Sequence, residues 1–240
     1  MTIEISNLYK SYKNFEAVKN LSFKINSGSI VGLLGPNGCG KTTTLGMILG
    51  LIQPSKGNVF INGKDVENEK NRIKVLEKMN FISPYVELPK KLTVKENLIV
   101  YGKMYEVENL QNRIENLIDE LNLGNFENRK TGELSSGQKN RVSLAKSLIN
   151  NPEILLLDEP TASLDPDTGD YIRGYIEKYA VNNKTTILLA SHNMNEVERL
   201  CSKVMMMKNG EIIDSGTCNE LVKKHGRLNL EETFLKLVRE

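Results

Sequence analysis

The sequence contains no apolar run long enough to cross a membrane as a helix. A membrane-spanning helix needs ~18 or more consecutive apolar residues, and the runs here, such as Ile30-Val31-Gly32-Leu33-Leu34, are far shorter. The opening stretch MTIEISNLYKSY also lacks the apolar core of a secretion signal. We therefore expect a cytoplasmic chain, and any membrane role must come through another polypeptide.

The chain also has few cysteines and almost no net charge. The three cysteines, Cys39, Cys201 and Cys218, show no ligand-like spacing, which argues against a disulfide framework or a zinc site. The 32 basic and 30 acidic residues leave a formal net charge of +2. Because binding to a phosphate backbone favours an excess of positive charge, we expect no nucleic acid among the partners.

What the chain has in quantity is apolar sequence arranged as alternating strands and helices. Its 240 residues are 39% hydrophobic, enough for one domain with a sizeable core. The runs 30–34, 154–157 and 185–189 are typical of buried strands, and 43–51 has helical spacing. Alternating buried strands and helices predict an α/β fold with a largely parallel sheet.

The middle of the chain, from 84 to 150, changes character. Apolar residues there recur at helical spacing, and Thr93-Val94-Lys95-Glu96 fits a capping box, in which each side chain satisfies an amide at the helix start. We interpret 84–150 as a helical insertion between two parts of a core, 1–83 and 151–240. Later elements are expected to be a helix from Asp165-Pro166, a hairpin over 204–213 and a closing helix over 228–238.

The stretch Gly35-Pro36-Asn37-Gly38-Cys39-Gly40-Lys41-Thr42 fits the pattern G-x-x-x-x-G-K-[ST]. It lies between a buried strand and a helix, where glycines let backbone amides face phosphate oxygens. Lys41 is expected to reach the β- and γ-phosphates, Thr42 to ligate Mg²⁺, and Thr43 to join the nucleotide-binding residues. A glycine-rich turn with a chance lysine is the alternative, and the strand–helix context disfavours it. We predict ATP and Mg²⁺ as the ligands.

A second signal lies where the apolar strand Ile154-Leu155-Leu156-Leu157 ends in Asp158-Glu159. Ligands of open α/β sheets bind at the carboxyl ends of strands, which puts both carboxylates near the phosphate loop. Asp158 is expected to hold Mg²⁺ through water, and Glu159 to polarise the attacking water. Alone, such a strand is more often one that simply reaches solvent. Together with the phosphate loop, it favours the functional interpretation.

The run Leu134-Ser135-Ser136-Gly137-Gln138 narrows the class of phosphate-binding protein that the chain resembles. It precedes a helix with Val142, Ala145 and Leu148 on one face, and so makes a second helix start suited to an anion. Out of context it would be a serine-rich helix cap. Placed between the phosphate loop and Asp158, it closely resembles the signature sequence of the ABC ATPase family.

The resemblance covers nearly the whole chain, because further motifs follow in family order. In that family Ser163-Leu164-Asp165 would be the D-loop, which contacts the partner subunit, and Ser191-His192 would hold the switch histidine that touches the γ-phosphate. A lone histidine after a strand is more often structural, but this position favours the family role for His192. Tyr12 matches the aromatic residue that stacks on adenine, with Tyr9 and Phe15 close by as alternatives.

The family implies one ABC ATPase domain over 1–240 with a P-loop NTPase (RecA-like) fold. Such a fold has a parallel-sheet core, an N-terminal antiparallel β-subdomain and an inserted helical subdomain. The family also implies that one chain supplies the phosphate loop and carboxylates. A second ATPase subunit, identical or related, supplies Ser135 and Gly137 across the γ-phosphate, with Gln138 beside them. Hydrolysis would then drive separate transmembrane permease subunits, which hold the chain at the inner face of the cell membrane. No import-specific feature is present, which favours export.

Two departures from the family pattern stand out. Ser136 replaces the commoner glycine of the signature, a small change. The stretch Phe81-Ile82-Ser83-Pro84-Tyr85-Val86 lacks the glutamine that the family usually has near Mg²⁺ and the attacking water. This predicts altered hydrolysis or coupling, with Ser83 as a weak oxygen substitute. The following Leu88-Pro89-Lys90-Lys91-Leu92 is expected to face the membrane partner.

Three other functions fit parts of the pattern. A non-transport ABC ATPase acting on ribosomes or DNA usually has two cassettes or a long coiled-coil insertion, whereas this chain has one cassette and no sustained heptads. The missing glutamine is compatible with a slow ATP-binding switch. The signature and His192 argue against a nucleotide kinase.

Cys39 lies inside the phosphate loop, which makes the loop chemically testable. We expect alkylation of Cys39 to block nucleotide binding, because the added bulk would intrude on the path of the phosphates. The measurement is ATP affinity before and after complete modification, and an unchanged affinity would contradict the expectation.

Overall fold

The computed structural model describes residues 2–84, 87–162 and 164–239. Within them the N-terminal part forms an antiparallel sheet in the order β2-β1-β4-β5, as expected. Its strands are β1 (Ile3–Tyr12), β2 (Phe15–Ile25), β4 (Lys56–Ile61) and β5 (Lys64–Asp65). Ile5 pairs with Phe23 on one side and with Val59 on the other, which sets the register of the three long strands.

A second sheet has the order β10-β9-β3-β8-β7-β6 among the described residues. Its strands are β3 (Ile30–Leu34), β6 (Met79–Ile82), β7 (Ile154–Asp158), β8 (Thr186–Ser191), β9 (Lys203–Lys208) and β10 (Glu211–Gly216). All neighbouring pairs are parallel except β9 with β10, which form the predicted hairpin. The α/β fold with a largely parallel sheet is confirmed.

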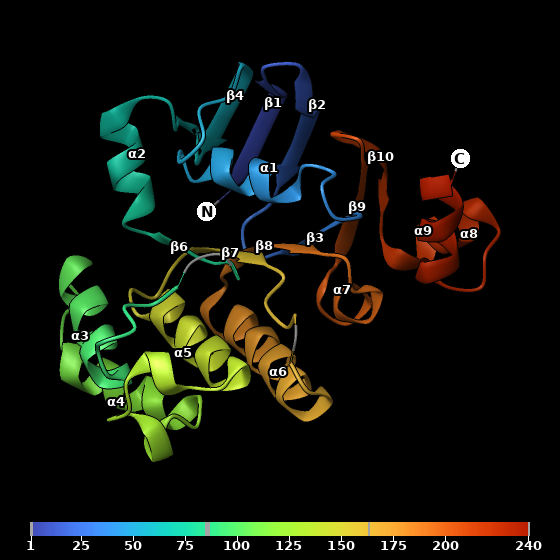
Figure 1. Cartoon of the computed structure of the whole chain (residues 1–240). Coiled ribbons are helices and arrows are strands. Elements are labelled where there is room, and N and C mark those ends of the chain that lie inside the picture. Colours follow the sequence, from blue (N-terminus) through green and yellow to red (C-terminus); the bar gives the residue numbers. More distant parts are fainter. Residues whose placement is uncertain (1, 85–86, 163, 240) are drawn as a thin grey trace.

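Continuous apolar runs form the central strands because both faces of this sheet are covered. Leu155 and Leu157 of β7 pack with the helices on one face, whereas Ile154 and Leu156 pack on the other face with α1 and the antiparallel sheet. Figure 1 shows α1 between the two sheets and α5 and α6 beneath the parallel sheet. A strand buried on both faces gains nothing from polar alternation, which explains the sequence pattern.

The helices follow the predicted alternation. Their bounds are α1 (Lys41–Ile48), α2 (Glu69–Leu76), α3 (Val94–Met104), α4 (Leu110–Glu120), α5 (Ser136–Leu148), α6 (Pro166–Asn183), α7 (Met194–Leu200), α8 (Cys218–His225) and α9 (Leu230–Arg239), with short 3-10 turns at Gly124–Phe126 and Thr131–Glu133. The first helix begins two residues earlier than expected, because Gly40 adopts a left-handed conformation and caps it directly. None of the described helices is long and apolar enough to cross a membrane.

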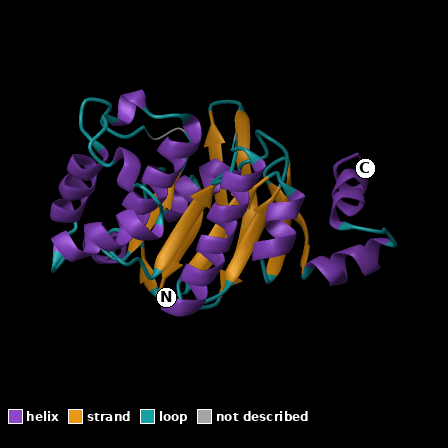
Figure 2. Ribbon diagram, turned by 90° about the horizontal axis from the view of Figure 1, so that it is seen from below, coloured by secondary structure: helices purple, strands orange, loops and turns teal. Residues whose placement is uncertain are grey.

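The expected insertion, 84–150, contains α3, α4 and α5, which form a group at the end of the molecule opposite to α8 and α9 (Figure 1, Figure 2). Asp165 caps α6 through a bond from the Thr168 amide, as the Asp-Pro pair indicated. The division of the chain into a core and a helical subdomain stays an interpretation of this arrangement.

The capping box at the start of α3 is present and testable. The Thr93 hydroxyl accepts a bond from the Glu96 amide at 3.1 Å, and the Glu96 carboxylate accepts one from the Thr93 amide at 2.8 Å. We predict that Thr93→Ala lowers the free energy of unfolding by about 1 kcal/mol in urea titration. Thr93→Ser, which keeps the hydroxyl, should retain most of it. Equal losses for the two variants would contradict the role of the cap.

Candidate active site

The phosphate loop, 35–40, joins the buried strand β3 to α1. It passes so close to other backbone that side chains do not fit. A Cβ at Gly35 would lie 2.5 Å from the Met207 carbonyl oxygen, and a Cβ at Gly40 would lie 2.4 Å from the Ala17 carbonyl oxygen. Gly40 also has a φ of 108°, which L side chains rarely adopt. Both glycines are therefore needed to wrap the loop tightly.

Lys41 is buried inside this loop. Its ammonium donates to the carbonyl oxygens of Gly35 at 2.7 Å and Pro36 at 3.2 Å, and lies 3.8 Å from a Glu159 carboxylate oxygen. A buried ammonium has to be paired with acceptors. The loop thus holds a positive charge at the start of α1, where backbone amides already favour an anion.

Thr42 and Asp158 meet beside the lysine, although they are far apart in the sequence. The Thr42 hydroxyl donates to Asp158 Oδ2 at 2.9 Å, and the Ser83 hydroxyl lies 3.5 Å from the same oxygen. Burial raises the pKa of Asp158, and the hydrogen bond from Thr42 offsets part of this. A hydroxyl and a carboxylate are hard oxygen donors, which suits Mg²⁺. No cluster of three His, Cys, Asp or Glu side chains occurs in the described ranges.

Glu159 and His192 form the second pair of the site. Glu159 Oε1 and His192 Nδ1 are 2.7 Å apart, and the Glu159 amide donates to the Ala190 carbonyl at 2.9 Å. Glu159 has a φ of 50°, a strained backbone conformation for a residue with a side chain. The imidazole is exposed to solvent, while the carboxylate is largely covered. The ends of β7 and β8 therefore bring the expected base and the expected switch histidine into contact.

A cleft of about 360 Å³ opens over these residues. Tyr12 and Phe15, which pair across β1 and β2, line it together with the loop residues Asn37, Gly38 and Gly40. Further residues of the lining are Ala17, Lys41, Thr42, Thr43, Asp158 and Glu159. Two exposed aromatic rings at the mouth provide an apolar platform for a flat base. Of the three aromatic candidates, Tyr9 does not line the cleft.

The signature residues do not reach this cleft. Ser135 caps α5 and forms a capping box with Gln138, and neither residue lines the cleft as described. A Cβ at Gly137 would meet Thr168 at 3.6 Å, an ordinary contact, so its own chain has room for a side chain there. The structure thus brings together the phosphate loop, Asp158 and Glu159 in the cleft and leaves Ser135, Gly137 and Gln138 outside it, whereas Ser136 lines a neighbouring groove that Glu159 also borders.

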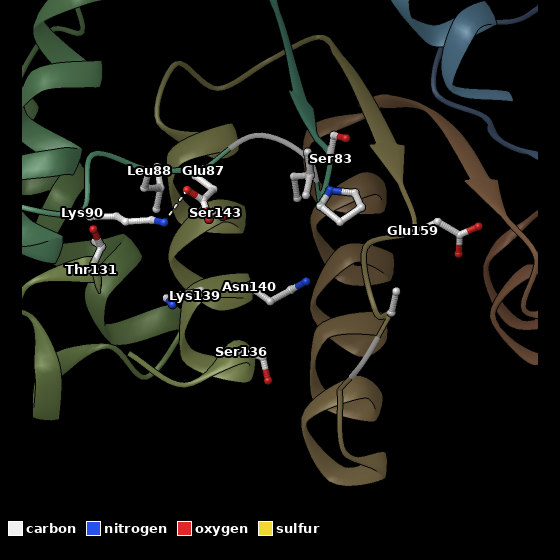
Figure 3. Close-up of a pocket in the computed structure, with 13 residues that line it drawn as sticks. Ser83, Glu87, Leu88, Lys90, Thr131, Ser136, Lys139, Asn140, Ser143 and Glu159 are labelled. Carbon is white, nitrogen blue, oxygen red and sulfur yellow. Dashed lines mark ion pairs between the residues drawn. The ribbon is translucent and has the colours of Figure 1, made fainter. Parts of the chain in front are cut away.

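A separate groove of about 260 Å³ lies between the end of β6 and α5 (Figure 3). Ser83 and Glu159 line it on one side, and Leu88 and Lys90 on the other, with Lys90 paired to Glu87 at 2.7 Å. Asn140 of α5 crosses towards the segment after Glu159 and donates to the Pro160 carbonyl at 2.6 Å. The helix that carries the signature is therefore bonded directly to the segment that follows the carboxylate.

The predicted D-loop is only partly described, because Ser163 lies outside the described residues, as do Tyr85 and Val86. Leu164 donates from its amide to the Thr161 carbonyl, and Asp165 caps α6. Its contact with a partner subunit stays a prediction.

The reason given for the effect of Cys39 alkylation is wrong. The thiol is 4% exposed and packs in the core between the two sheets, beside Gly35, so bulk added to it would enter the core rather than the phosphate path. Burial is also the main cause that raises the pKa of Cys39, which lowers its reactivity. Cys39 contributes to the loop through its backbone, since its carbonyl accepts a bond from the Gly210 amide.

Two polar residues near the site were missed by the sequence patterns. Thr161 and Glu196 are buried and bonded to each other at 2.8 Å. Glu196 lies four residues after His192 in a charged stretch, NMNEVERL, that reads as an ordinary solvent-facing helix. Only its contact with Thr161 in the folded chain distinguishes Glu196 from a surface glutamate.

The family model described as ABC transporter matches residues 18–162. The chain belongs to the ABC transporter family. The match includes the phosphate loop, the signature and the Asp-Glu pair, all three of which the sequence had assigned to that family.

Curated relatives place this ABC protein among transporter ATP-binding subunits. It is 37% identical over 234 residues to the ABC transporter ATP-binding protein NatA of Bacillus subtilis, covering 95% of this chain and 93% of the relative. It is 36% identical over 227 residues to the Nod factor export ATP-binding protein I of Rhizobium johnstonii, covering 93% of this chain and 72% of the relative. The chain is therefore the ATP-binding subunit of an ABC transporter.

Solved ABC cassettes share the fold. A dimeric cassette in a post-hydrolysis state bound to ADP and Pi has a TM-score of 0.84 and 28% identity, with 90% of this chain and 98% of that one covered. An ATP-binding subunit of an ABC transporter has a TM-score of 0.88 and 25% identity, with 99% of both chains covered. These likenesses confirm the P-loop NTPase fold and support binding of adenine nucleotides.

The geometry of the phosphate loop predicts a large difference between two glycine substitutions. Gly40→Ala should lower the free energy of unfolding by more than about 2 kcal/mol and weaken ATP binding at least about tenfold, because it combines positive φ with a clash against the Ala17 carbonyl. Gly63→Ala is the matched control, since Gly63 has a φ of 71° but no heavy atom near the added Cβ. It should cost only about 1 kcal/mol and leave ATP binding intact.

Urea titration and ATP titration of both variants provide the measurement. Equal destabilisation by the two substitutions, with equal ATP affinity, would show that the close approach at Gly40 does not matter.

Proposed function

We propose that this chain hydrolyses MgATP as one of two paired ATPase subunits and drives export through separate membrane subunits. The observation that supports the proposal most directly is the incomplete site. The phosphate loop, Lys41, Asp158 and Glu159 line one cleft, and the signature residues 135–138, which are exposed or half-buried, line no part of it. A second copy supplies that missing side.

The phosphate loop and Lys41 bind the triphosphate. Loop amides and the start of α1 face the phosphate oxygens, and Lys41 exchanges its carbonyl partners for the β- and γ-phosphates. Thr42 and Asp158 hold Mg²⁺, which neutralises charge on the phosphates when bound. Tyr12 stacks on adenine, with Phe15 beside it at the mouth of the cleft.

Glu159 and His192 act at the γ-phosphate. Glu159 accepts a proton from the attacking water, and His192 orients the carboxylate through the 2.7 Å contact and touches the γ-phosphate. Ser83 lies near Asp158 where the family usually has glutamine, and its shorter side chain leaves more room around the water. We expect slower basal hydrolysis for that reason.

The second subunit closes the site with its signature. Ser135 and Gly137 at the start of α5 place amides and a hydroxyl opposite the γ-phosphate, so that ATP joins the two chains until it is hydrolysed. The space around Gly137 within its own chain supports this role, since a position without a side chain leaves room for a neighbouring molecule to approach the start of α5. Solved relatives described as dimeric cassettes support the pairing.

Membrane subunits dock beside the helical insertion, at a groove that the segment expected to face them, 88–92, does not line. An apolar groove of about 690 Å³ lies between the parallel sheet and α3, with Leu51, Ile73 and Met104 among the exposed side chains at its edge. Phe81 of β6 lines this groove, and the same strand continues through Ser83 towards Asp158. A displacement at the groove therefore has a short path to the site. The export relatives support the direction of transport.

The central test replaces the proposed base. Glu159→Gln should lower the ATPase rate by about 10²–10⁴-fold, because the amide cannot accept the proton, and should accumulate a MgATP-bound dimer. Glu153→Gln is the control, since Glu153 is a half-exposed carboxylate paired with Lys78 at the surface. Turnover and light scattering with and without MgATP measure both effects.

Two results would count against the proposal. Equal turnover of the wild type and Glu159→Gln would favour a slow ATP-binding switch instead of an ATPase. A strictly monomeric Glu159→Gln protein at saturating MgATP, together with full turnover of Gly137→Trp, would rule out the shared site.

A further inference from the structure

Glu196 is a buried carboxylate that the proposed reaction does not use directly. It lies in the first turn of α7, is 1% exposed, and is fixed at its backbone by a bond from its amide to the Asn193 side chain. Burying a carboxylate is costly unless hydrogen bonds compensate. The partners of its two oxygens therefore indicate what this position is for.

Each of the two carboxylate oxygens accepts a hydrogen bond from a hydroxyl, and the two hydroxyls lie at or after the ends of different strands. The Thr161 hydroxyl donates to Oε1 at 2.8 Å, and the Ser191 hydroxyl donates to Oε2 at 2.7 Å. The Ser191 oxygen also accepts the Asn193 amide at 3.0 Å, which fixes the direction of its own proton. Glu196 thus joins the segment after β7 to the end of β8.

These two segments carry the hydrolytic pair. Thr161 follows Glu159 by two residues, and Ser191 immediately precedes His192. The side chains of Glu159 and His192 are in contact at 2.7 Å, so these two segments and Glu196 form a closed ring. Removing one link of the ring frees one end of the Glu159–His192 contact to move.

An amide at this position would lose one of the two accepted bonds or reverse its direction. A carboxylate accepts at both oxygens, whereas a glutamine side chain has one acceptor and one donor group. Burial raises the pKa of Glu196, and the bonds from Ser191 and Thr161 lower it, so the ionised form depends on those two hydroxyls. Both hydroxyls can donate to the side chain at once when the carboxylate is ionised. These two bonds join the segment of Thr161 to the segment of Ser191.

We propose that Glu196 is a positioning residue for ATP hydrolysis, holding the segments of Glu159 and His192 at the separation at which both side chains act on the γ-phosphate. This inference rests on the proposed function. Glu196 is not among the residues that line the nucleotide-binding cleft, and it acts through Thr161 and Ser191.

The test separates positioning from folding and from binding. Glu196→Gln in the full chain should lower kcat about tenfold while KM for MgATP and the affinity for a fluorescent ATP analogue change less than about twofold. Glu198→Gln is the matched control on the same helix. The Glu198 carboxylate accepts a bond from the Leu230 amide, a bond that a glutamine oxygen can also accept. The kcat of this variant should therefore stay within about twofold of the wild type.

A second variant tests whether the hydroxyl bonds to Glu196 are what holds the two segments in place. Thr161→Val keeps the shape and removes one link, so it should also lower kcat with little effect on KM, and it serves the test alone if Glu196→Gln does not fold. The double variant should be no slower than Glu196→Gln within about twofold, because both substitutions break the same ring.

Each contrary result has a distinct meaning. A lowered melting temperature with unchanged kcat in Glu196→Gln, or fully additive losses in the double variant, would overturn the positioning role alone. A wild type that binds MgATP without hydrolysing it would overturn the proposed function and this inference with it.

Discussion

Three parallel strands that end at one edge of a sheet are the constraint on which the site depends. β3, β8 and β7 are neighbours, and their registers align Leu34 with Ser191 and Ala190 with Asp158. The phosphate loop, the carboxylates and His192 therefore leave the sheet at one level. Thr42 and Asp158, 116 positions apart, can meet at 2.9 Å because backbone hydrogen bonds have already placed both strand ends.

The phosphate-binding site also depends on close packing behind the phosphate loop. The loop is pressed against backbone from β2 and from the end of β9, so glycine is the only residue that fits at Gly35 and Gly40. Behind it, α1 fills the space between the two sheets with apolar side chains. Rigid surroundings keep the amides directed towards one point, which is what phosphate binding needs.

The helical insertion is attached to this site at few but specific points. Asn140 of α5 bonds the Pro160 carbonyl, next to Glu159. Lys146, on the same helix, is buried against the rings of Phe81 and Tyr101, and burial lowers its pKa to about 8. A movement of α5 would thus displace both the segment that follows Glu159 and the strand β6, which borders the apolar groove. This arrangement suits a protein that passes the state of its nucleotide to a neighbour.

The sequence by itself determined the phosphate loop, the Asp158-Glu159 pair, the α/β class and the start of α3 and α6, because each depends on short-range patterns of residue type. It misjudged the thiol of Cys39 and did not reveal Glu196. Whether a side chain near a loop faces a ligand or the core is decided by packing from distant segments. Only the tertiary structure could decide that a glutamate in a charged helix is buried, since its two hydroxyl partners come from separate strand ends.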